Sequence, residues 1–194
     1  HEPMACTLHK LGFKVCVLNP ARSKDFANSL GNTHKTDLKD SVMLALFSHR
    51  MMPRAWQPES PEVRELKALL ARFDALETDL QRELNRLEKD QFSCSSDRII
   101  ESITHMVTYL TAEKKQLEQS IDDHIDRHPQ LKKDRDLMTS ILGVGRVVSR
   151  VMLSVLHGHQ FACAGQVAAF IGLIPWIQES GQWKGRSRLS KQGS

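Results

Sequence analysis

The residues near the end of the chain are those whose types and spacing favour chemistry on a nucleic acid. Ser180 precedes Gly181, and the segment that follows contains four cations and no acid: Lys184, Arg186, Arg188 and Lys191. A serine hydroxyl is a weak nucleophile that a base or a metal must activate, while cations hold phosphates and offset charge in a transition state. Ser-Gly alone is an ordinary turn signal. The adjacent cations favour attack on a phosphate backbone.

A pair of carboxylates near the start of the chain is a candidate metal site. Asp37 and Asp40 are three residues apart, so a helix places both on one side. Two neighbouring carboxylates repel each other unless a cation neutralises them, and Mg²⁺ sites of nucleases use this arrangement. Acids are also common in the first turn of a solvated helix. Spacing alone favours that second interpretation.

A Gly-x-Gly turn lies between two apolar helical segments. Gly143 and Gly145 flank Val144 in a pattern typical of a helix-hairpin-helix motif. Its glycines let backbone N–H groups approach a DNA phosphate at the positive end of the second helix, where Arg146 and Arg150 would add charge. The alternative is a plain tight turn between two helices.

The histidines and cysteines give weaker signals. His124 and His128 are four residues apart, but Ile125 stands where a metalloprotease helix has Glu, so we expect both histidines to be solvated. The four cysteines form no CxxC pair, which argues against a zinc ribbon and favours a reduced, cytosolic protein.

The elements that position these residues fall into three parts. Residues 1–50 resemble the back end of an α/β domain: a helix over 2–11, a buried strand over 13–18, a helix over 21–30 and a helix capped by Thr36. Residues 51–59 contain two prolines and are expected to form a linker.

The middle of the chain shows a helical period over a long distance. Ser60-Pro61 is a strong helix start, and apolar residues recur at intervals of three and four up to about residue 128, with a break near Gln91 to Ser96. We expect residues 60–128 to form a long antiparallel coiled-coil hairpin that also supports dimerisation. Residues 129–194 follow as a small helical domain that ends in loops or short strands, with a helix over 161–172.

Composition is that of an ordinary globular protein. The 194 residues are 40% hydrophobic and 26% charged, with a formal net charge of +4. A mildly basic chain of this kind permits a polyanionic partner. No apolar run approaches the roughly 18 residues that a membrane helix needs.

Taken in order, these motifs resemble the DEDD-type insertion-sequence transposases related to the Piv DNA invertase, a group that includes bridge-RNA-guided recombinases. The segments that carry the resemblance are His1-Glu2-Pro3 through Leu11-Gly12, Val17 to Pro20, Phe26 to Gly31, Lys35-Thr36-Asp37 with Asp40, Leu142 to Gly145, Phe161, Ala168 to Pro175, Ser180-Gly181 and Ser190 to Gly193.

The resemblance implies a mostly α fold with the C-terminal part of a RuvC-like nuclease domain, a coiled coil and a transposase domain. It matches Asp37 and Asp40 to the third and fourth acids of a Mg²⁺ site, and Ser180 to a serine that forms a covalent phosphoserine link with DNA. DNA is the implied partner, a guide RNA is a further option, and the bacterial cytoplasm, at the nucleoid, is the implied location.

Four departures from the family pattern stand out. The first Asp and the Glu of the acidic site would precede His1, Ser41 replaces an Ala, Trp176 follows Pro175 where a charged residue is usual, and the C-terminal basic helix is short. We therefore expect a fragment that is inactive alone, from a DNA transposase that acts as an oligomer. The alternative is a non-catalytic coiled-coil protein that binds DNA or RNA.

Overall fold

Two compact units divide the chain, His1–Pro58 and Glu59–Ser194, in a computed structural model that describes residues 2–31, 36–93, 96–176, 179–181 and 183–189. The described residues are mostly helical, with eight helices and four two-residue strands. The division falls at the end of the segment 51–59 that the sequence marks as a linker. None of the described helices is both long and apolar enough to cross a membrane.

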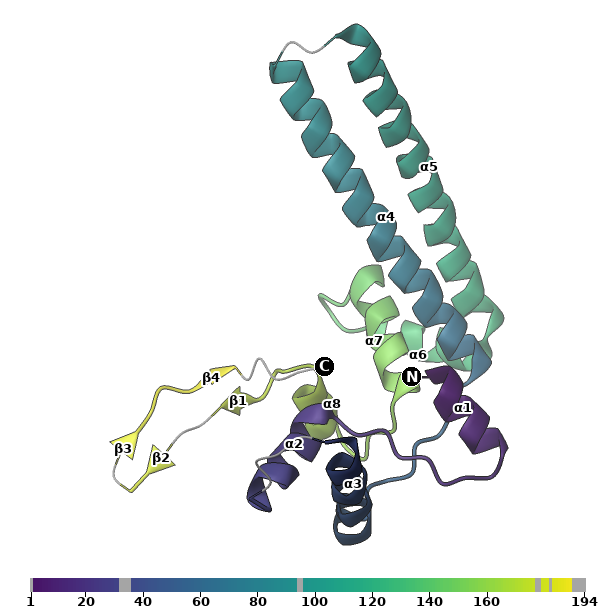
Figure 1. Ribbon diagram of the computed structural model, residues 1–194. Helices are drawn as coiled ribbons and strands as arrows, with labels where there is room; N and C mark the ends of the chain where they lie inside the picture. The colour runs from purple at the N-terminus through teal and green to yellow at the C-terminus, as the bar shows by residue number, and fades with distance from the viewer. Residues whose placement is uncertain (1, 32–35, 94–95, 177–178, 182, 190–194) are drawn as a thin grey trace. The chain divides into compact units, whose positions relative to one another are not determined.

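The N-terminal unit contains α1 (Glu2–Lys10), α2 (Pro20–Ser29) and α3 (Asp37–Met51), as drawn in Figure 1. Helix α2 packs on α3 through Phe26 and Phe47, whose rings meet edge to face with centroids 5.1 Å apart. Thr36 caps α3, as the sequence predicts, because its hydroxyl accepts a hydrogen bond from Lys39 N.

The buried strand expected over residues 13–18 is wrong. The segment is irregular, and Phe13 and Val17 are exposed. A strand needs a neighbour that pairs with its backbone groups along its whole length. Here the segment's one long-range backbone bond among the described residues runs from Trp56 N to Val15 O, at 2.7 Å.

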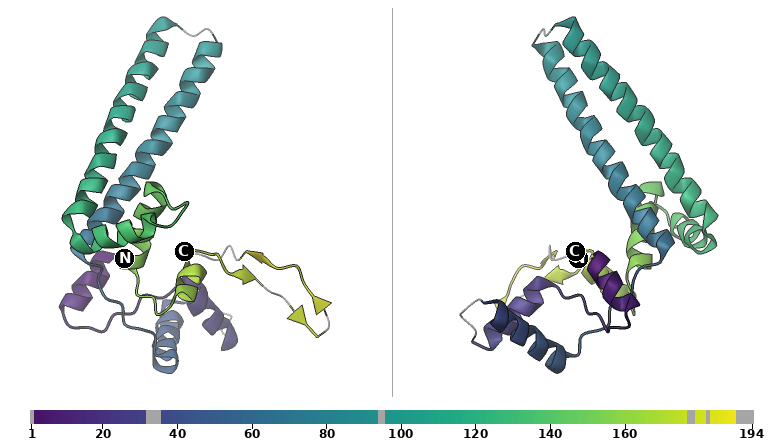
Figure 2. Two further views of the ribbon diagram at one scale, coloured as in Figure 1. Left: turned by 180° about the vertical axis from the view of Figure 1, so that it is seen from behind. Right: turned by 45° about the vertical axis from the view of Figure 1, so that its right-hand side comes forward.

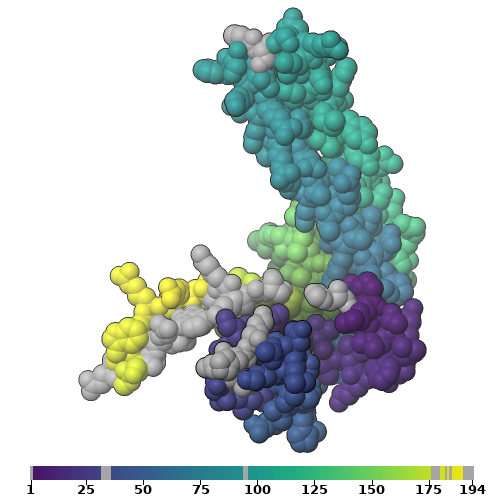
Figure 3. Space-filling view, in the orientation of Figure 1, coloured from purple at the N-terminus to yellow at the C-terminus, as the bar shows by residue number. Residues whose placement is uncertain are grey.

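Two long helices dominate the C-terminal unit. Helices α4 (Pro61–Phe92) and α5 (Asp97–Arg127) run antiparallel and pack along each other, as Figures 1 and 2 show. At 1.5 Å per residue each is roughly 45–50 Å long. We call this pair the hairpin. Its far end extends well beyond α7 (Figure 3), so the hairpin is held at its base.

The base of the hairpin carries the main core of this unit. Helices α6 (Pro129–Thr139) and α7 (Arg146–Gly158) pack there against α4 and α5. The fully buried side chains of this core come from all four helices: Leu66, Ile121, Ile125, Leu131 and Leu153. These apolar contacts fix the turn between α6 and α7 relative to the hairpin.

The remainder of the unit is a short helix and a narrow ribbon. Helix α8 (Ala164–Phe170) is shorter than the expected 161–172. Cys163 is its N-cap residue, and Gly172, two residues after its end, has a positive φ of 75° that a helix cannot continue through. Strands β1 (Pro175–Trp176) and β4 (Arg188–Leu189) pair antiparallel, and β2 (Glu179–Ser180) pairs with β3 (Trp183–Lys184).

Candidate nucleic-acid interface and catalytic residues

The turn between α6 and α7 has the backbone geometry that its glycines predict. Gly143 adopts a φ of 91°, a conformation that other residues rarely take. Gly145 has a φ of −87° and is the N-cap residue of α7. A Cβ built at either position meets no heavy atom within 4 Å. The turn is therefore open to an incoming partner.

The start of α7 presents backbone donors. Ser149 N bonds to Gly145 O at 3.0 Å and is the first N–H of the helical ladder. The N–H groups of the three residues before it have no intrahelical partner, as at every helix start. Together with the helix dipole they favour a negatively charged group such as a phosphate.

The two arginines of α7 have different roles. Arg146 has a side chain 77% exposed, and its Nη1 lies 3.7 Å from Asp122 Oδ2. Arg150 has a side chain only 3% exposed, and it bonds to Asp122 twice, at 3.1 and 2.7 Å, and to Glu118 at 3.0 Å. The expectation that Arg150 adds charge to a DNA-binding surface is wrong, because α5 neutralises and covers it.

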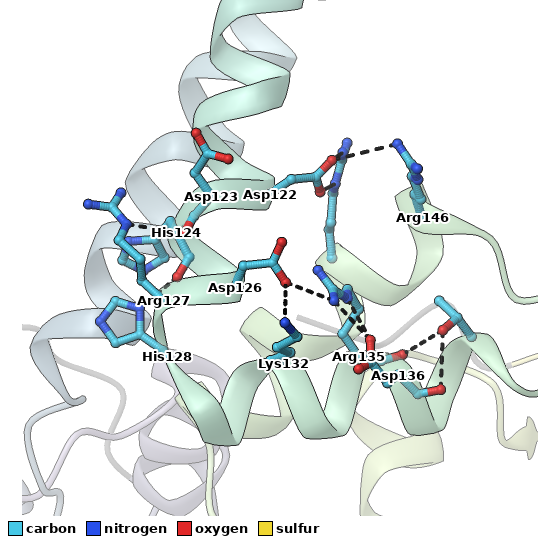
Figure 4. Close-up of polar contacts among 12 residues, drawn as sticks. Asp122, Asp123, His124, Asp126, Arg127, His128, Lys132, Arg135, Asp136 and Arg146 are labelled. Atoms are coloured by element: carbon cyan, nitrogen blue, oxygen red, sulfur yellow. Dashed lines mark hydrogen bonds and ion pairs between the residues drawn. The ribbon is translucent and has the colours of Figure 1, made fainter.

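A row of acids on α5 joins the hairpin to α6 and α7. Glu118, Asp122 and Asp126 are spaced by four residues and so lie on one face of α5. Asp126 accepts from Arg135 of α6 at 2.9 Å and lies 3.5 Å from Lys132 (Figure 4). Sequence reasoning missed this row, although the repeat of acids at intervals of four was a signal for it.

The same contacts set the ionisation of Asp126. The hydrogen bond from Arg135 is the largest effect and holds the pKa of this carboxyl below its ordinary value. Burial, the next largest effect, raises the pKa, and the charges of Arg135 and Lys132 lower it further.

A hollow of about 590 Å³ lies beside these ion pairs. It is lined by residues of α5, α6, the turn after α6 and α7: Gln119, Asp122, Asp126, Arg135, Thr139, Val144, Gly145, Arg146, Ser149 and Arg150.

Ser180 is the last residue of β2. It is exposed, it stands opposite Trp183 in the β2–β3 register, and Gly181 follows with a φ of 59°. Positive φ at this place is typical of the tight turns that join two strands. No described residue hydrogen-bonds its hydroxyl, so the structure identifies no activating base.

Three of the four cations that the sequence predicts to bind phosphate lie in β3, in β4 or between them. Arg186 and Arg188 are exposed, and Arg188 pairs with Trp176 in the β1–β4 register. Lys184 belongs to β3. Lys191 lies outside the described residues. The ribbon therefore carries the candidate nucleophile and three of its four candidate phosphate ligands.

Asp37 and Asp40 occupy the first turn of α3 in the N-terminal unit. Neither carboxylate forms an ion pair with a cation among the described residues. Hard, unpaired carboxylate oxygens suit Mg²⁺, which takes one or two of them and keeps several waters. The described residues contain no cluster of three or more His, Cys, Asp or Glu arranged for a metal. That Asp37 and Asp40 are metal ligands therefore stays a prediction from the sequence.

The expectation that His124 and His128 are both solvated is wrong; His124 belongs to α5, and His128 stands between α5 and α6. His124 is buried, and its Nε2 donates to Glu62 O at 2.8 Å. His128 is half-buried, and its Nδ1 donates to His124 O at 2.7 Å. Both bonds tie the end of α5 to neighbouring backbone. This pair therefore has a structural role at the base of the hairpin.

Comparison with known proteins gives matches at both ends of the chain. Residues 1–90 match a DEDD-type family model described as a transposase. Residues 135–194 match a model described as the transposase IS116/IS110/IS902 family.

Two curated relatives extend this similarity across the hairpin. Over 169 residues the chain is 30% identical to the pilin gene-inverting protein of Moraxella bovis and 31% identical to that of Moraxella lacunata. Each comparison covers 87% of this chain but 51% of the relative. The chain thus spans about half the length of the curated relatives it matches.

Proposed function

The chain belongs to the IS116/IS110/IS902 family of transposases, and we propose that it serves in a DNA recombinase that cuts DNA strands and rejoins them. The observation that carries this proposal is the match to two transposase models, over residues 1–90, which include most of α4, and over residues 135–194. The name of the two relatives, pilin gene-inverting protein, also describes a rearrangement of DNA.

We assign DNA binding to the C-terminal unit. Gly143 and Gly145 open the turn so that the first N–H groups of α7 can reach a phosphate, and the exposed Arg146 adds a cation beside them. The cations of the ribbon, Lys184, Arg186, Arg188 and Lys191, would hold further phosphates near Ser180.

We assign metal binding to the N-terminal unit. The DEDD-type domain that matches residues 1–90 implies a divalent metal ion, and we propose Mg²⁺ with Asp37 and Asp40 among its ligands. A bound Mg²⁺ neutralises charge on a scissile phosphate. The two aspartates would hold it by their carboxylate oxygens, at the start of α3 that Thr36 caps.

We assign the nucleophile to Ser180. Its oxygen would attack phosphorus and form a phosphoserine ester, while the bond from phosphorus to the deoxyribose oxygen breaks. The proton lost by the serine balances the proton gained by the leaving oxygen. Because the ester keeps the energy of the broken bond, the reverse reaction on a second strand end rejoins DNA without a further energy source.

The arrangement of domains completes the proposal. Residues 1–50 would be the C-terminal part of a RuvC-like domain, residues 60–128 a coiled coil that joins copies of the chain, and residues 129–194 the transposase domain with its helix-hairpin-helix motif. A guide RNA as a further partner stays an expectation from the resemblance alone.

Strand exchange tests the assignments of Ser180, Asp37 and Asp40. The assay uses the protein as its gene encodes it, with and without Mg²⁺. We expect Ser180→Ala, Asp37→Asn and Asp40→Asn each to abolish exchange, because each removes a group that touches the scissile phosphate or the metal. Ser187→Ala on the same ribbon and Asp25→Asn on α2 are the matched controls, and both should retain exchange.

Retained exchange in Ser180→Ala would rule out the serine mechanism. DNA binding without exchange in the unsubstituted protein would favour the alternative, a non-catalytic binding protein.

A further inference from the structure

An exposed apolar ridge surrounds the candidate phosphate-binding turn. Leu142, directly before Gly143, is fully exposed at 103% of its reference area. Ile141 on one side and Val147 and Val148 on the other are also exposed. Contiguous exposed apolar side chains, such as these around the turn between α6 and α7, commonly mark a contact with a partner.

Helix α7 turns this apolar surface outward. Its buried face carries Ser149, Arg150 and Ser154 next to Leu153, whereas Val147, Val148 and Val151 face solvent. An ordinary surface helix shows the opposite pattern. Here the inward face is held by the ion pairs of Arg150 with Asp122 and Glu118. The outward face is therefore free for a different contact.

The charges around the ridge favour a polyanion as that partner. From Leu137 to Gln178 the sequence contains no Asp or Glu. From Leu137 to the last residue it contains a single acid, Glu179, and five Lys and Arg residues besides the buried, paired Arg150. Of these five, Arg146 is the cation at the turn; its side chain is 77% exposed and its Nη1 lies 3.7 Å from Asp122 Oδ2. Such an excess of cations attracts phosphates and gives a protein partner no special advantage.

We propose that Leu142, supported by Ile141, inserts as a wedge between base pairs of duplex DNA and kinks it. Apolar side chains inserted from the minor groove partly unstack a base step, and the bend lets more of the protein contact the backbone. Leu142 is placed for this, because the next residues, Gly143 to Arg146, would hold the flanking phosphates. The inference rests on the proposed DNA binding by this turn.

Base unstacking tests the wedge directly. The probe is a duplex of roughly 30 base pairs with 2-aminopurine at a central TpA step, a flexible step that kinks readily. Binding of the 194-residue chain should raise the fluorescence of 2-aminopurine, which increases on unstacking. Leu142→Ala should bring the fluorescence of the bound duplex down to that of the free duplex. Leu137→Ala, which removes another exposed leucine away from the turn, should leave the rise unchanged.

Affinity and its salt dependence separate the wedge from the phosphate contacts. Leu142→Ala should weaken binding by at most about 15- to 60-fold, the value of two or three buried methylene groups at about 0.8 kcal/mol each. The slope of log binding constant against log salt concentration should stay unchanged, because the substitution removes no charge. Arg146→Ala should lower that slope by about 1, since it removes one phosphate contact.

The outcomes distinguish the wedge from the function on which it rests. Bound duplex with no fluorescence rise, or an equal rise with Leu142→Ala, would overturn the wedge while DNA binding stands. No salt-dependent binding by the unsubstituted chain would overturn DNA binding itself. A change in oligomeric mass with Leu142→Ala, without a change in fluorescence, would assign the ridge to a second protein chain and overturn the wedge.

Discussion

The ion pair between Asp122 and Arg150 should be a principal source of stability at the base of the hairpin. Arg150 has a side chain 3% exposed, and two of its three side-chain hydrogen bonds go to Asp122. Asp122→Asn keeps the shape of the side chain and one acceptor oxygen but removes the charge. Glu118, whose side chain is 44% exposed, is then the one carboxylate left to balance the charge of the buried guanidinium.

The cost follows from this geometry. Removing one partner of a buried ion pair costs about 3–5 kcal/mol, because the other charge stays buried and uncompensated. The oxygen kept by Asn and the remaining bond to Glu118 place Asp122→Asn at the lower end, at about 3 kcal/mol. For a unit of this size that loss lowers the melting temperature by about 10 °C.

Urea unfolding followed by circular dichroism measures this loss. Asp123→Asn is the matched control, because Asp123 is exposed and its side chain accepts only from Gln119, also on the surface. It should change the free energy of unfolding by less than about 0.5 kcal/mol. Asp122→Asn combined with Arg150→Met should cost less than Asp122→Asn alone, since no buried charge is left over. A loss in Asp122→Asn no larger than in the control would refute the reasoning.

Two further predictions concern the same region. Stability of the C-terminal unit should decrease as the pH falls below the ordinary Asp value of 3.8. The hydrogen bond from Arg135 lowers the pKa of Asp126 in the folded state, so the ionised carboxylate stabilises the fold. This stabilisation is lost as the pH falls through the lowered pKa. Asp126→Asn should flatten this dependence in unfolding measured across that range, and an unchanged dependence would contradict it. Gly143→Ala should cost about 1–2 kcal/mol, because the φ of 91° is strained for any residue with a Cβ although the space is open. Gly145→Ala, at negative φ with equal space, should stay within about 0.5 kcal/mol, and equal losses in the two variants would contradict the role of φ.

Local signals in the sequence predict much of the fold. Thr36 marks the start of α3, and Pro61 occupies the first position of α4. Gly12 and Gly31 follow α1 and α2 with positive φ, as helix ends predict. Each of these features depends on residues within one turn of the position concerned, so the sequence alone is enough.

Features that depend on distant partners are not predicted. The segment 13–18 has the composition of a strand, but composition cannot supply a neighbouring strand. Arg150 reads as a surface cation until α5 places Asp122 against it, 28 residues away in the sequence. Leu142 is fully exposed, which its apolar neighbours in the sequence do not predict.

A covalent link between DNA and Ser180 is the most direct test of the central claim. The protein as its gene encodes it would be incubated with Mg²⁺ and end-labelled duplex DNA, denatured, digested with protease and analysed by mass spectrometry. The account predicts a nucleotide joined through phosphate to the peptide that contains Ser180, and no adduct in Ser180→Ala. An adduct on another residue, or an equal yield in Ser180→Ala, would contradict it.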